Sequence, residues 1–240
     1  HFFRGDKFSE HLGTDTAETC NTYNMLTLTR ILFAWDPNVR LMDFYERGLY
    51  NHILASQDPK KGMFTYYVSL KPGHFKTYSM PEDSFWCCVG TGMENHSKYA
   101  DTIYFHDSNS LWVNLFIPSE LDWIEKKLTV TQETKFPEYD MTTLVFKAAK
   151  PVDLTIRIRC PQWLSSEAQF TLNGKKLDVS GVVGEYAAIS RQWQEGDKLE
   201  VKLPMSLHLE TLPNAQTIVA FLYGPIVLAG QLSTEGMPGS

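Results

Sequence analysis

The chain has 240 residues, of which 43% are hydrophobic and 21% charged, and these proportions of a folded globular protein exclude a disordered chain. Its 22 Lys and Arg residues against 28 Asp and Glu residues give a formal net charge of −6, which disfavours a nucleic-acid partner. No apolar run approaches the ~18 residues of a membrane-spanning helix, so no membrane span is expected.

The first part of the chain has the periodicity of α-helices. The apolar spacing predicts a helix over residues 15–35, with Asp15 as its N-cap, and a second helix over residues 39–56. Residues 58–86 mix glycines and prolines with aromatic residues, which predicts long loops with a short pair of strands. A third helix is predicted over residues 92–104. Helices joined by so long a loop would make a poor domain alone, so we expect them to belong to a larger helical assembly.

After residue 106 the pattern changes to short alternating runs that are separated by turn residues. This pattern predicts a β-sandwich of about 120 residues. The pair Asn173-Gly174 between two apolar runs is typical of a tight hairpin turn. The predicted strands cover residues 111–117, 128–132, 143–146, 154–158, 169–172, 186–189, 199–203 and 218–223.

A carboxylate and three thiols are the candidate metal ligands: Glu18, Cys20, Cys87 and Cys88. This donor set suits a borderline metal such as zinc, which takes four ligands. Their spacing raises an objection, because residues i and i+2 lie on opposed sides of a helix and neighbours point apart in an extended chain. A shared metal therefore requires an irregular helix entry at one pair and a bend at the other.

Each of these residues also has a plainer interpretation. Glu18 fits a capping-box partner of Asp15, and Cys20 fits a buried apolar residue. Cys87 and Cys88 fit a strained vicinal disulfide that acts as a redox switch. The fourth cysteine, Cys160, closes a predicted strand and is expected only to pack.

Other polar residues are weaker candidates. His96 is expected to be a core histidine, and Tyr66 and Tyr67 either face a cleft or pack. Glu82 and Glu94 lie near the cysteine pair and could serve as an acid, although a solvated surface role is the plainer expectation. The sequence has no phosphate-binding loop, no dinucleotide-binding glycine motif after a strand and no Gly-x-Ser-x-Gly motif.

Five stretches carry distinctive motifs: residues 18–26 (ETCNTYNML), 45–54 (YERGLYNHIL), 84–92 (SFWCCVGTG), 113–119 (VNLFIPS) and 223–225 (YGP). Together they closely resemble the β-L-arabinofuranosidase family, which is glycoside hydrolase family 127 with its sister family 146, formerly a domain of unknown function. The resemblance covers nearly the whole chain.

The resemblance implies a multidomain α+β fold. Residues 1–106 would be the C-terminal portion of a helical (α/α)6 catalytic barrel, and residues 107–240 would form the β-sandwich domain. The N-terminal half of the barrel would then lie upstream of this chain, and that missing half or a second copy in a homo-oligomer would cover the helices.

The resemblance also assigns roles to single residues. Zinc would be held by Glu18, Cys20, Cys87 and Cys88, with Cys87 as the catalytic nucleophile. Tyr67 would lie in the sugar site. The implied reaction is the retaining hydrolysis of β-L-arabinofuranosides, or related furanosides, in plant-derived arabinose-containing oligosaccharides or glycans.

One departure concerns the general acid/base. In the family this glutamate directly precedes a His/Ala-Phe pair, a position that would fall just before His1-Phe2 and is absent here. Asp6 and Glu10 are the nearest carboxylates, and neither matches the pattern. We therefore expect this chain alone to be catalytically incomplete.

The alternative is a non-catalytic fragment, in which zinc is structural and the sandwich binds carbohydrate or packs. A Cys87 sulfur that opens onto a cleft would favour catalysis, whereas a sealed one would favour the structural role. A bacterial source is expected, and the compartment is left open between cytoplasmic and periplasmic or extracellular.

Overall fold

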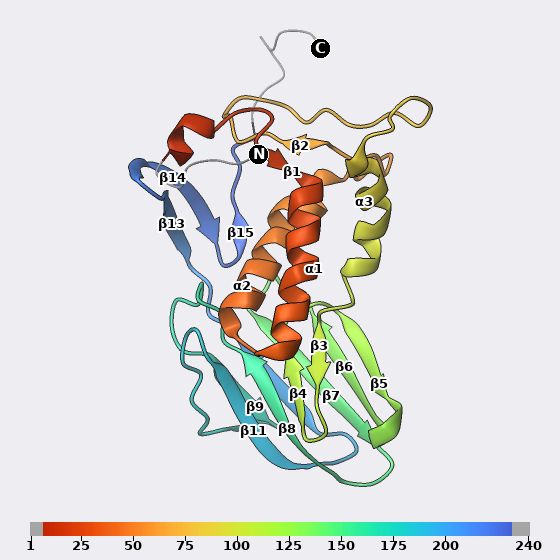
Figure 1. Cartoon of the computed structure of the whole chain (residues 1–240). Helices are drawn as coiled ribbons and strands as arrows, with labels where there is room; N and C mark the ends of the chain where they lie inside the picture. Colours follow the sequence, from red (N-terminus) through yellow and green to blue (C-terminus); the bar gives the residue numbers. More distant parts are fainter. Residues whose placement is uncertain (1–6, 232–240) are drawn as a thin grey trace.

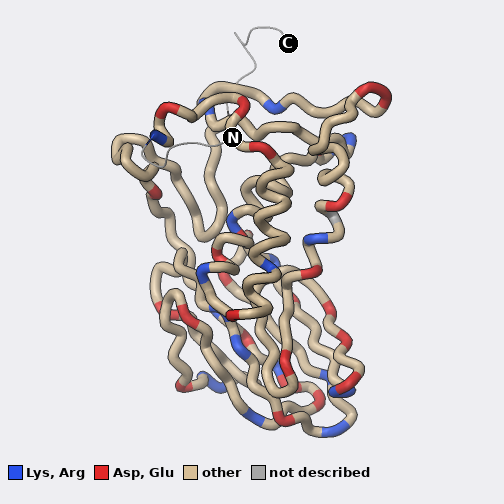
Figure 2. Tube along the Cα trace, viewed as in Figure 1, with Lys and Arg blue, Asp and Glu red and all other residues tan. Residues whose placement is uncertain are grey.

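A computed structural model describes residues 7–231, apart from the side chain of His96. The candidate carboxylate Asp6 and the predicted core position of the His96 side chain therefore lie outside the described residues. The chain has a mixed α+β fold, with helices at one end and layered sheets at the other (Figure 1). Basic and acidic residues are interspersed along both parts (Figure 2).

Helix α1 (Thr19–Trp35) packs against α2 (Val39–Gly48) and α3 (Cys87–Asn95). The predicted helix over residues 39–56 is present as one helical path, because α2 continues into a π-helical turn, η2 (Leu49–Ile53), and a short 3-10 turn, η3 (Leu54–Ser56). Among the described residues, none of the helices combines the length and apolar character that crossing a bilayer requires.

The start of α1 differs from the prediction. Ala17–Glu18 form strand β1, which pairs with β2 (Tyr67–Val68), and the helix begins only at Thr19. This pairing holds Glu18 in an extended conformation (φ −79°, ψ 129°), and its side chain makes no capping hydrogen bond. The predicted N-cap at Asp15 and the capping-box role of Glu18 are therefore wrong. Helix α1 buries Leu26 and Phe33, whereas Ile31 is exposed.

Helix α3 also begins at a different place, at Cys87 rather than at residue 92, and it ends at Asn95. A short 3-10 turn, η4 (His96–Lys98), follows it. The helix runs through Gly92, where a Cβ would lie 2.6 Å from the ring of Phe64. A glycine is therefore required at this close approach, and the cysteine pair begins a helix instead of occupying a bend.

Two sheets share the larger hydrophobic core and form the sandwich. One has the strand order β10-β9-β12-β7-β6-β5 and the other β11-β8-β4-β3, and β4 and β8 form the parallel pair in the second sheet. Their bounds are β3 (Tyr104–His106), β4 (Ser110–Val113), β5 (Ser119–Trp123), β6 (Leu128–Thr134), β7 (Met141–Ala148), β8 (Val152–Arg159), β9 (Gln169–Leu172), β10 (Lys175–Lys176), β11 (Tyr186–Trp193) and β12 (Lys198–Lys202). A 3-10 turn, η5 (Ile124–Lys126), follows β5, and another, η1 (Phe8–His11), precedes β1.

The hairpin prediction at Asn173-Gly174 is confirmed. These two residues connect β9 to β10 and have φ angles of 51° and 78°. Two consecutive positive φ angles are what a two-residue hairpin turn of this type requires, and Asn and Gly tolerate them best.

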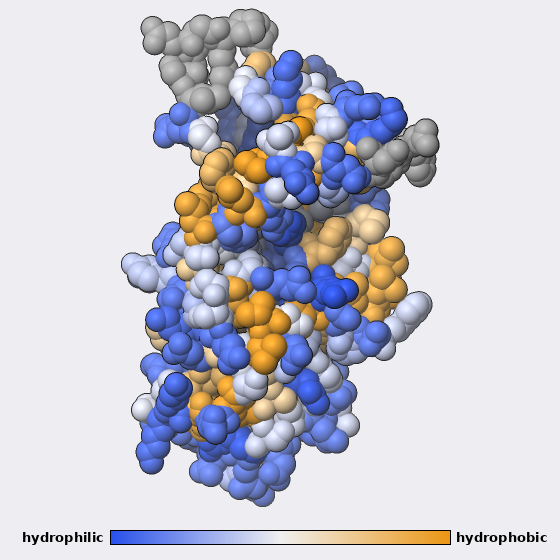
Figure 3. Space-filling model, turned by 90° about the vertical axis from the view of Figure 1, so that its left-hand side faces the viewer, coloured by the Kyte–Doolittle hydropathy of each residue, from blue (hydrophilic) through white to orange (hydrophobic). Residues whose placement is uncertain are grey.

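The predicted strand over residues 218–223 forms, but outside the two sandwich sheets. It belongs to β14 (Ala215–Tyr223), which pairs with β13 (Leu207–Leu212) and β15 (Ile226–Val227) in a sheet beside the helices (Figure 1). Leu209 and Phe221 are cross-strand partners on this sheet and are 56% and 53% exposed. Figure 3 views this side of the molecule and shows apolar patches among hydrophilic surface.

A buried charged network joins α2 to the sandwich. The Arg159 side chain is fully buried at the end of β8, where it donates to Asp43 and Glu46 (both 2.5 Å) and to the Asn114 carbonyl (2.6 Å). Glu46 also accepts a hydrogen bond from Trp163 Nε1 at 2.7 Å. Burial raises the pKa of the Glu46 carboxyl, and Arg159 and Trp163 oppose this shift. The network fixes the helices on the sandwich.

Candidate metal and thiol centre

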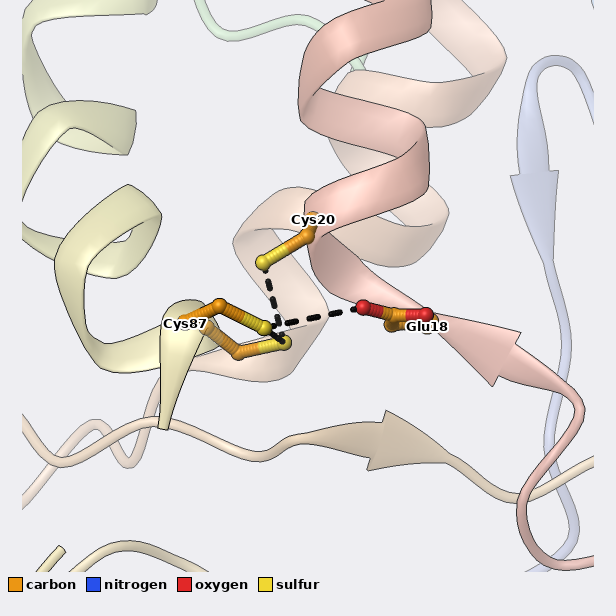
Figure 4. Close-up of side chains that lie close together, drawn as sticks. Glu18, Cys20 and Cys87 are labelled. Carbon is orange, nitrogen blue, oxygen red and sulfur yellow. Dashed lines mark hydrogen bonds between the residues drawn. The ribbon is translucent and has the colours of Figure 1, made fainter. Parts of the chain in front are cut away.

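The four candidate ligands converge on one point between β1, α1 and α3. One donor atom from each of Glu18, Cys20, Cys87 and Cys88 lies within 4.8 Å of the others (Figure 4). The Cys20 and Cys88 sulfurs are 3.2 Å apart, and Cys87 Sγ lies 3.9 Å from Cys88 Sγ and 3.7 Å from Glu18 Oε1.

The local backbone conformation lets both residue pairs converge, although their spacing in sequence argued against it. Glu18 is the last residue of a strand and Cys20 lies in the first turn of the following helix, so the two are not on opposed sides of one helix. Cys87 and Cys88 are the first residues of α3, where successive side chains are rotated by only about 100° about the axis. Both pairs can therefore face the same point.

Backbone and side-chain contacts hold the first pair in place. The Thr19 amide donates to the Tyr66 carbonyl at 3.2 Å, next to the β1–β2 pairing. Its hydroxyl reaches the Thr65 carbonyl at 3.3 Å, and Cys20 Sγ lies 3.3 Å from Thr91 Oγ1 in α3. The segment is thus tied both to the loop before the cysteine pair and to the helix that carries it.

The thiols differ in exposure and acidity. Cys20 and Cys88 are only 8% and 1% exposed, whereas Cys87 is exposed. Burial raises the pKa of the Cys20 thiol to about 12. Hydrogen bonding from Cys20 and then from Tyr66 lowers the pKa of the Cys87 thiol, and its place at a helix N-terminus acts in the same direction. Cys87 is therefore the thiol of the cluster best suited to react with a ligand from solvent.

The donor set fits zinc. Three thiols and one carboxylate are common zinc ligands, and a tetrahedral site with zinc–sulfur bonds of about 2.3 Å places its sulfurs about 3.8 Å apart. The observed sulfur separations of 3.2 and 3.9 Å lie close to this value, so small side-chain adjustments suffice. The structure has all four cysteines of the chain as free thiols.

Aromatic side chains surround the exposed thiol. The hydroxyl of Tyr66 lies 3.7 Å from Cys87 Sγ, and its ring stacks on Tyr67 with a centroid distance of 4.4 Å and contacts Trp86 at 5.8 Å. The family resemblance assigns Tyr67 to the sugar site, whereas the tyrosine whose hydroxyl lies beside the thiol is Tyr66. The pairing of Tyr67 with Glu18 brings this tyrosine pair to the thiol cluster.

The remaining candidates lie in other settings. Glu94 accepts a hydrogen bond from the Tyr23 hydroxyl, which raises the pKa of Tyr23 to about 12. Glu10 pairs with a lysine at the surface, and Glu82 is exposed. Cys160 is fully buried in the sandwich core, as the sequence predicted, and burial raises the pKa of its thiol to about 11.

A cavity of about 550 Å³ lies elsewhere, between α2, the sandwich and the sheet of β13 to β15. It is lined by groups that already pair with one another, such as Glu46 with Trp163 and Arg47 with Glu210. None of the four cluster residues lines it. This cavity is therefore separate from the thiol cluster.

Two family models match the chain. The model of the GH127 catalytic domain of β-L-arabinofuranosidases matches residues 1–101, and the model of the GH127 middle domain matches residues 110–205. A search of curated proteins returned no match.

Solved structures share the fold. A GH127 β-L-arabinofuranosidase from Geobacillus stearothermophilus T6 is 25% identical with a TM-score of 0.72, and 90% of this chain covers 37% of it. A glycoside hydrolase is 21% identical with a TM-score of 0.75, and the match covers 90% of this chain and 38% of that protein. A GH127 β-arabinofuranosidase is 23% identical with a TM-score of 0.73, and the match covers 90% of this chain and 37% of that protein. The chain thus spans less than two fifths of the length of each.

Proposed function

The chain belongs to glycoside hydrolase family 127, and from this premise we propose that it forms part of a retaining glycosidase with Cys87 as its nucleophile. The substrates would be β-L-arabinofuranosides or related furanosides in plant-derived, arabinose-containing oligosaccharides or glycans. The observation that carries the proposal is the exposed Cys87 sulfur, which lies 3.7 Å from Glu18 Oε1 in a cluster whose other two sulfurs are buried.

Glu18, Cys20, Cys87 and Cys88 would hold a zinc ion, since their donor atoms already lie within 4.8 Å of one another. When bound, zinc would keep these thiols deprotonated at neutral pH. Tyr66 would place its hydroxyl beside the Cys87 sulfur, and the adjacent Tyr67 would contact the sugar, as the resemblance implies.

The reaction would take two displacements at one carbon. The Cys87 sulfur attacks the anomeric carbon, and the glycosidic carbon–oxygen bond breaks as the carbon–sulfur bond forms. The leaving oxygen keeps the bonding electron pair and takes a proton from a general acid. Water then attacks the same carbon, the conjugate base accepts its proton, and the thiolate leaves unchanged. Two inversions in sequence retain the anomeric configuration.

We place the general acid/base outside the described residues. Glu18 belongs to the thiol cluster, Glu94 is bonded to Tyr23, and Glu10 pairs with Lys7 at the surface. The resemblance expects this glutamate before the first residue of the chain. The coverage of only 37% of the Geobacillus enzyme is compatible with that position.

The same proposal includes the (α/α)6 barrel, of which residues 1–106 would be the C-terminal portion. The catalytic-domain model matches residues 1–101, which supports this assignment. A row of apolar side chains on α1 is exposed and would be covered by further barrel helices or by a second copy: Met25, Leu28, Ile31 and Trp35.

The 240-residue chain alone is expected to hydrolyse a nitrophenyl β-L-arabinofuranoside at least about 100-fold more slowly than a longer protein that carries the rest of the barrel. The reason is that a positioned acid/base typically contributes about 10²–10⁴-fold. Initial rates of the two proteins at equal concentration provide the measurement. Comparable rates would show that Asp6, Glu10 or Glu94 acts as the acid, contrary to this assignment.

The chain is expected to bind one zinc ion, counted by metal analysis after dialysis against a weak chelator. Cys88→Ser is expected to lower the zinc affinity by at least about tenfold, because it removes a buried thiolate ligand. Cys160→Ser is the matched control, since Cys160 lies in the sandwich core and its loss leaves all four donors in place. Absence of zinc binding by the reduced wild-type chain would contradict the metal site.

A second candidate function is purely structural. A zinc site with four protein ligands and no open position is typical of structural zinc, and the burial of Cys20 and Cys88 fits that role. Zinc would then only brace β1 and α1 against α3, and the sandwich would bind carbohydrate or pack. Retention of turnover after Cys87→Ser, together with a loss of stability, would favour this function.

A further inference from the structure

We propose that His52 is a positioning residue for the Glu18 and Cys20 side of the thiol centre. Its ring makes one hydrogen bond to the residue before Glu18 and another to a residue after Cys20. The metal part of the inference rests on the proposed function, because it assumes that Glu18 and Cys20 bind zinc.

The two hydrogen bonds of the ring bracket the ligand pair. His52 Nε2 lies 3.1 Å from the carbonyl oxygen of Ala17, the residue before Glu18. His52 Nδ1 lies 2.7 Å from Thr22 Oγ1, two residues beyond Cys20. One imidazole ring therefore contacts both strand β1, at Ala17, and the first turn of α1, at Thr22.

These partners define the state of the ring. A carbonyl oxygen only accepts, so His52 Nε2 carries the hydrogen and donates to Ala17, and Nδ1 accepts the hydroxyl hydrogen of Thr22. Burial lowers the pKa of His52, which agrees with a neutral ring. Both ring nitrogens therefore make hydrogen bonds to the segment that carries Glu18 and Cys20.

The π-helical turn η2 explains how His52 reaches this place. Single π-helical turns within helices are frequent at functional sites. Here Asn51 bonds the Pro225 carbonyl and the Val227 amide, both at 2.8 Å, in the sheet of β13 to β15. His52, the next residue, points to β1 and α1 instead. Neighbouring residues of one turn therefore serve two different parts of the fold.

The bridge from His52 complements the contacts on the other side of the segment. There, β2 and the Tyr66 carbonyl hold Glu18 and Thr19. Without the ring, the Ala17 carbonyl and the Thr22 hydroxyl would lose these partners, and the turn between β1 and α1 would keep only its contacts with the β2 segment and with α3. Cys87 and Cys88 have no hydrogen bond to His52, so its loss should affect the Glu18 and Cys20 side alone.

The test compares the zinc affinity of the whole chain as wild type, His52→Leu and Thr22→Val by competition with a chromogenic chelator. Partners behind metal ligands typically affect affinity by about 10–100-fold, so we expect a loss of about tenfold or more for His52→Leu and a smaller loss for Thr22→Val. Asn51→Ala is the matched control, because it removes three side-chain hydrogen bonds of the same turn, to Arg47, Pro225 and Val227, and none of them involves the cluster. It should leave the zinc affinity within about twofold of wild type.

Amide hydrogen exchange of residues 17–22 in the metal-free chain gives a second readout that does not depend on zinc. Faster exchange is expected in His52→Leu and unchanged exchange in Asn51→Ala. Wild-type affinity and exchange in His52→Leu, or in Thr22→Val if His52→Leu does not fold, would overturn the inference. If wild type binds no zinc while His52→Leu still exchanges faster, the metal site fails and the positioning role stands.

Discussion

Replacing Cys87 by serine is expected to reduce turnover of a β-L-arabinofuranoside by at least about a thousand-fold in a form of the protein that is active. The neutral serine hydroxyl has no counterpart to the thiolate, and loss of the nucleophile removes the whole covalent route. Steady-state kcat on the nitrophenyl substrate, with zinc content measured on the same samples, provides the test.

Cys160→Ser is the matched control for that experiment. Its thiol is fully buried in the sandwich core and its pKa is raised, so it is neither exposed nor acidic. We expect nearly unchanged turnover from the folded variant. Cys88→Ser separates the two proposed roles of Cys87, because it removes a buried thiol of the proposed zinc site without removing the exposed thiol. Loss of activity for both Cys87→Ser and Cys160→Ser at unchanged stability would contradict the assignment.

Glu46→Ala is expected to lower the free energy of unfolding by about 3–5 kcal/mol. The substitution removes the more deeply buried of the two carboxylates that pair with the fully buried Arg159 and leaves only Asp43, and breaking one side of a buried ion pair typically has a cost of this size. It also leaves Trp163 Nε1 without its acceptor. Denaturant unfolding monitored by circular dichroism measures the difference.

Glu210→Ala is the matched control for the buried pair. Glu210 makes a two-point contact with Arg47 on the same helix, α2, but both side chains are partly exposed to solvent. Exposed pairs of this kind contribute about 0–1 kcal/mol. Equal losses for Glu46→Ala and Glu210→Ala would show that the buried Arg159 does not depend on Glu46, which would contradict the role given to this ion pair.

Local signals in the sequence predicted much of the strand-rich part. The strand over residues 169–172 and its turn at Asn173-Gly174 appear as predicted, because alternation and turn residues act over a few positions. The start of α1 could not be predicted in this way. It is set by the pairing of Glu18 with Tyr67, which lies far along the chain.

The convergence of Glu18, Cys20, Cys87 and Cys88 was predictable from residue type and family resemblance, but the local geometry of the cluster was not. The objection about spacing assumed one regular helix at Glu18 and an extended chain at Cys87, and the structure has a strand-to-helix junction and a helix start instead. Tyr66 and His52 act through contacts with residues distant in sequence, with Cys87 and with Ala17 and Thr22. No pattern local to either residue reveals such partners.

The most direct test of the central claim is to locate the covalent intermediate. An active form of the protein would be quenched in acid during turnover of an activated β-L-arabinofuranoside, digested, and mapped by mass spectrometry. The account predicts a pentosyl group on the peptide that contains Cys87, attached to sulfur and lost in the Cys87→Ser variant. A pentosyl group on a carboxylate peptide, such as the one with Glu18, would contradict the thiolate as the nucleophile.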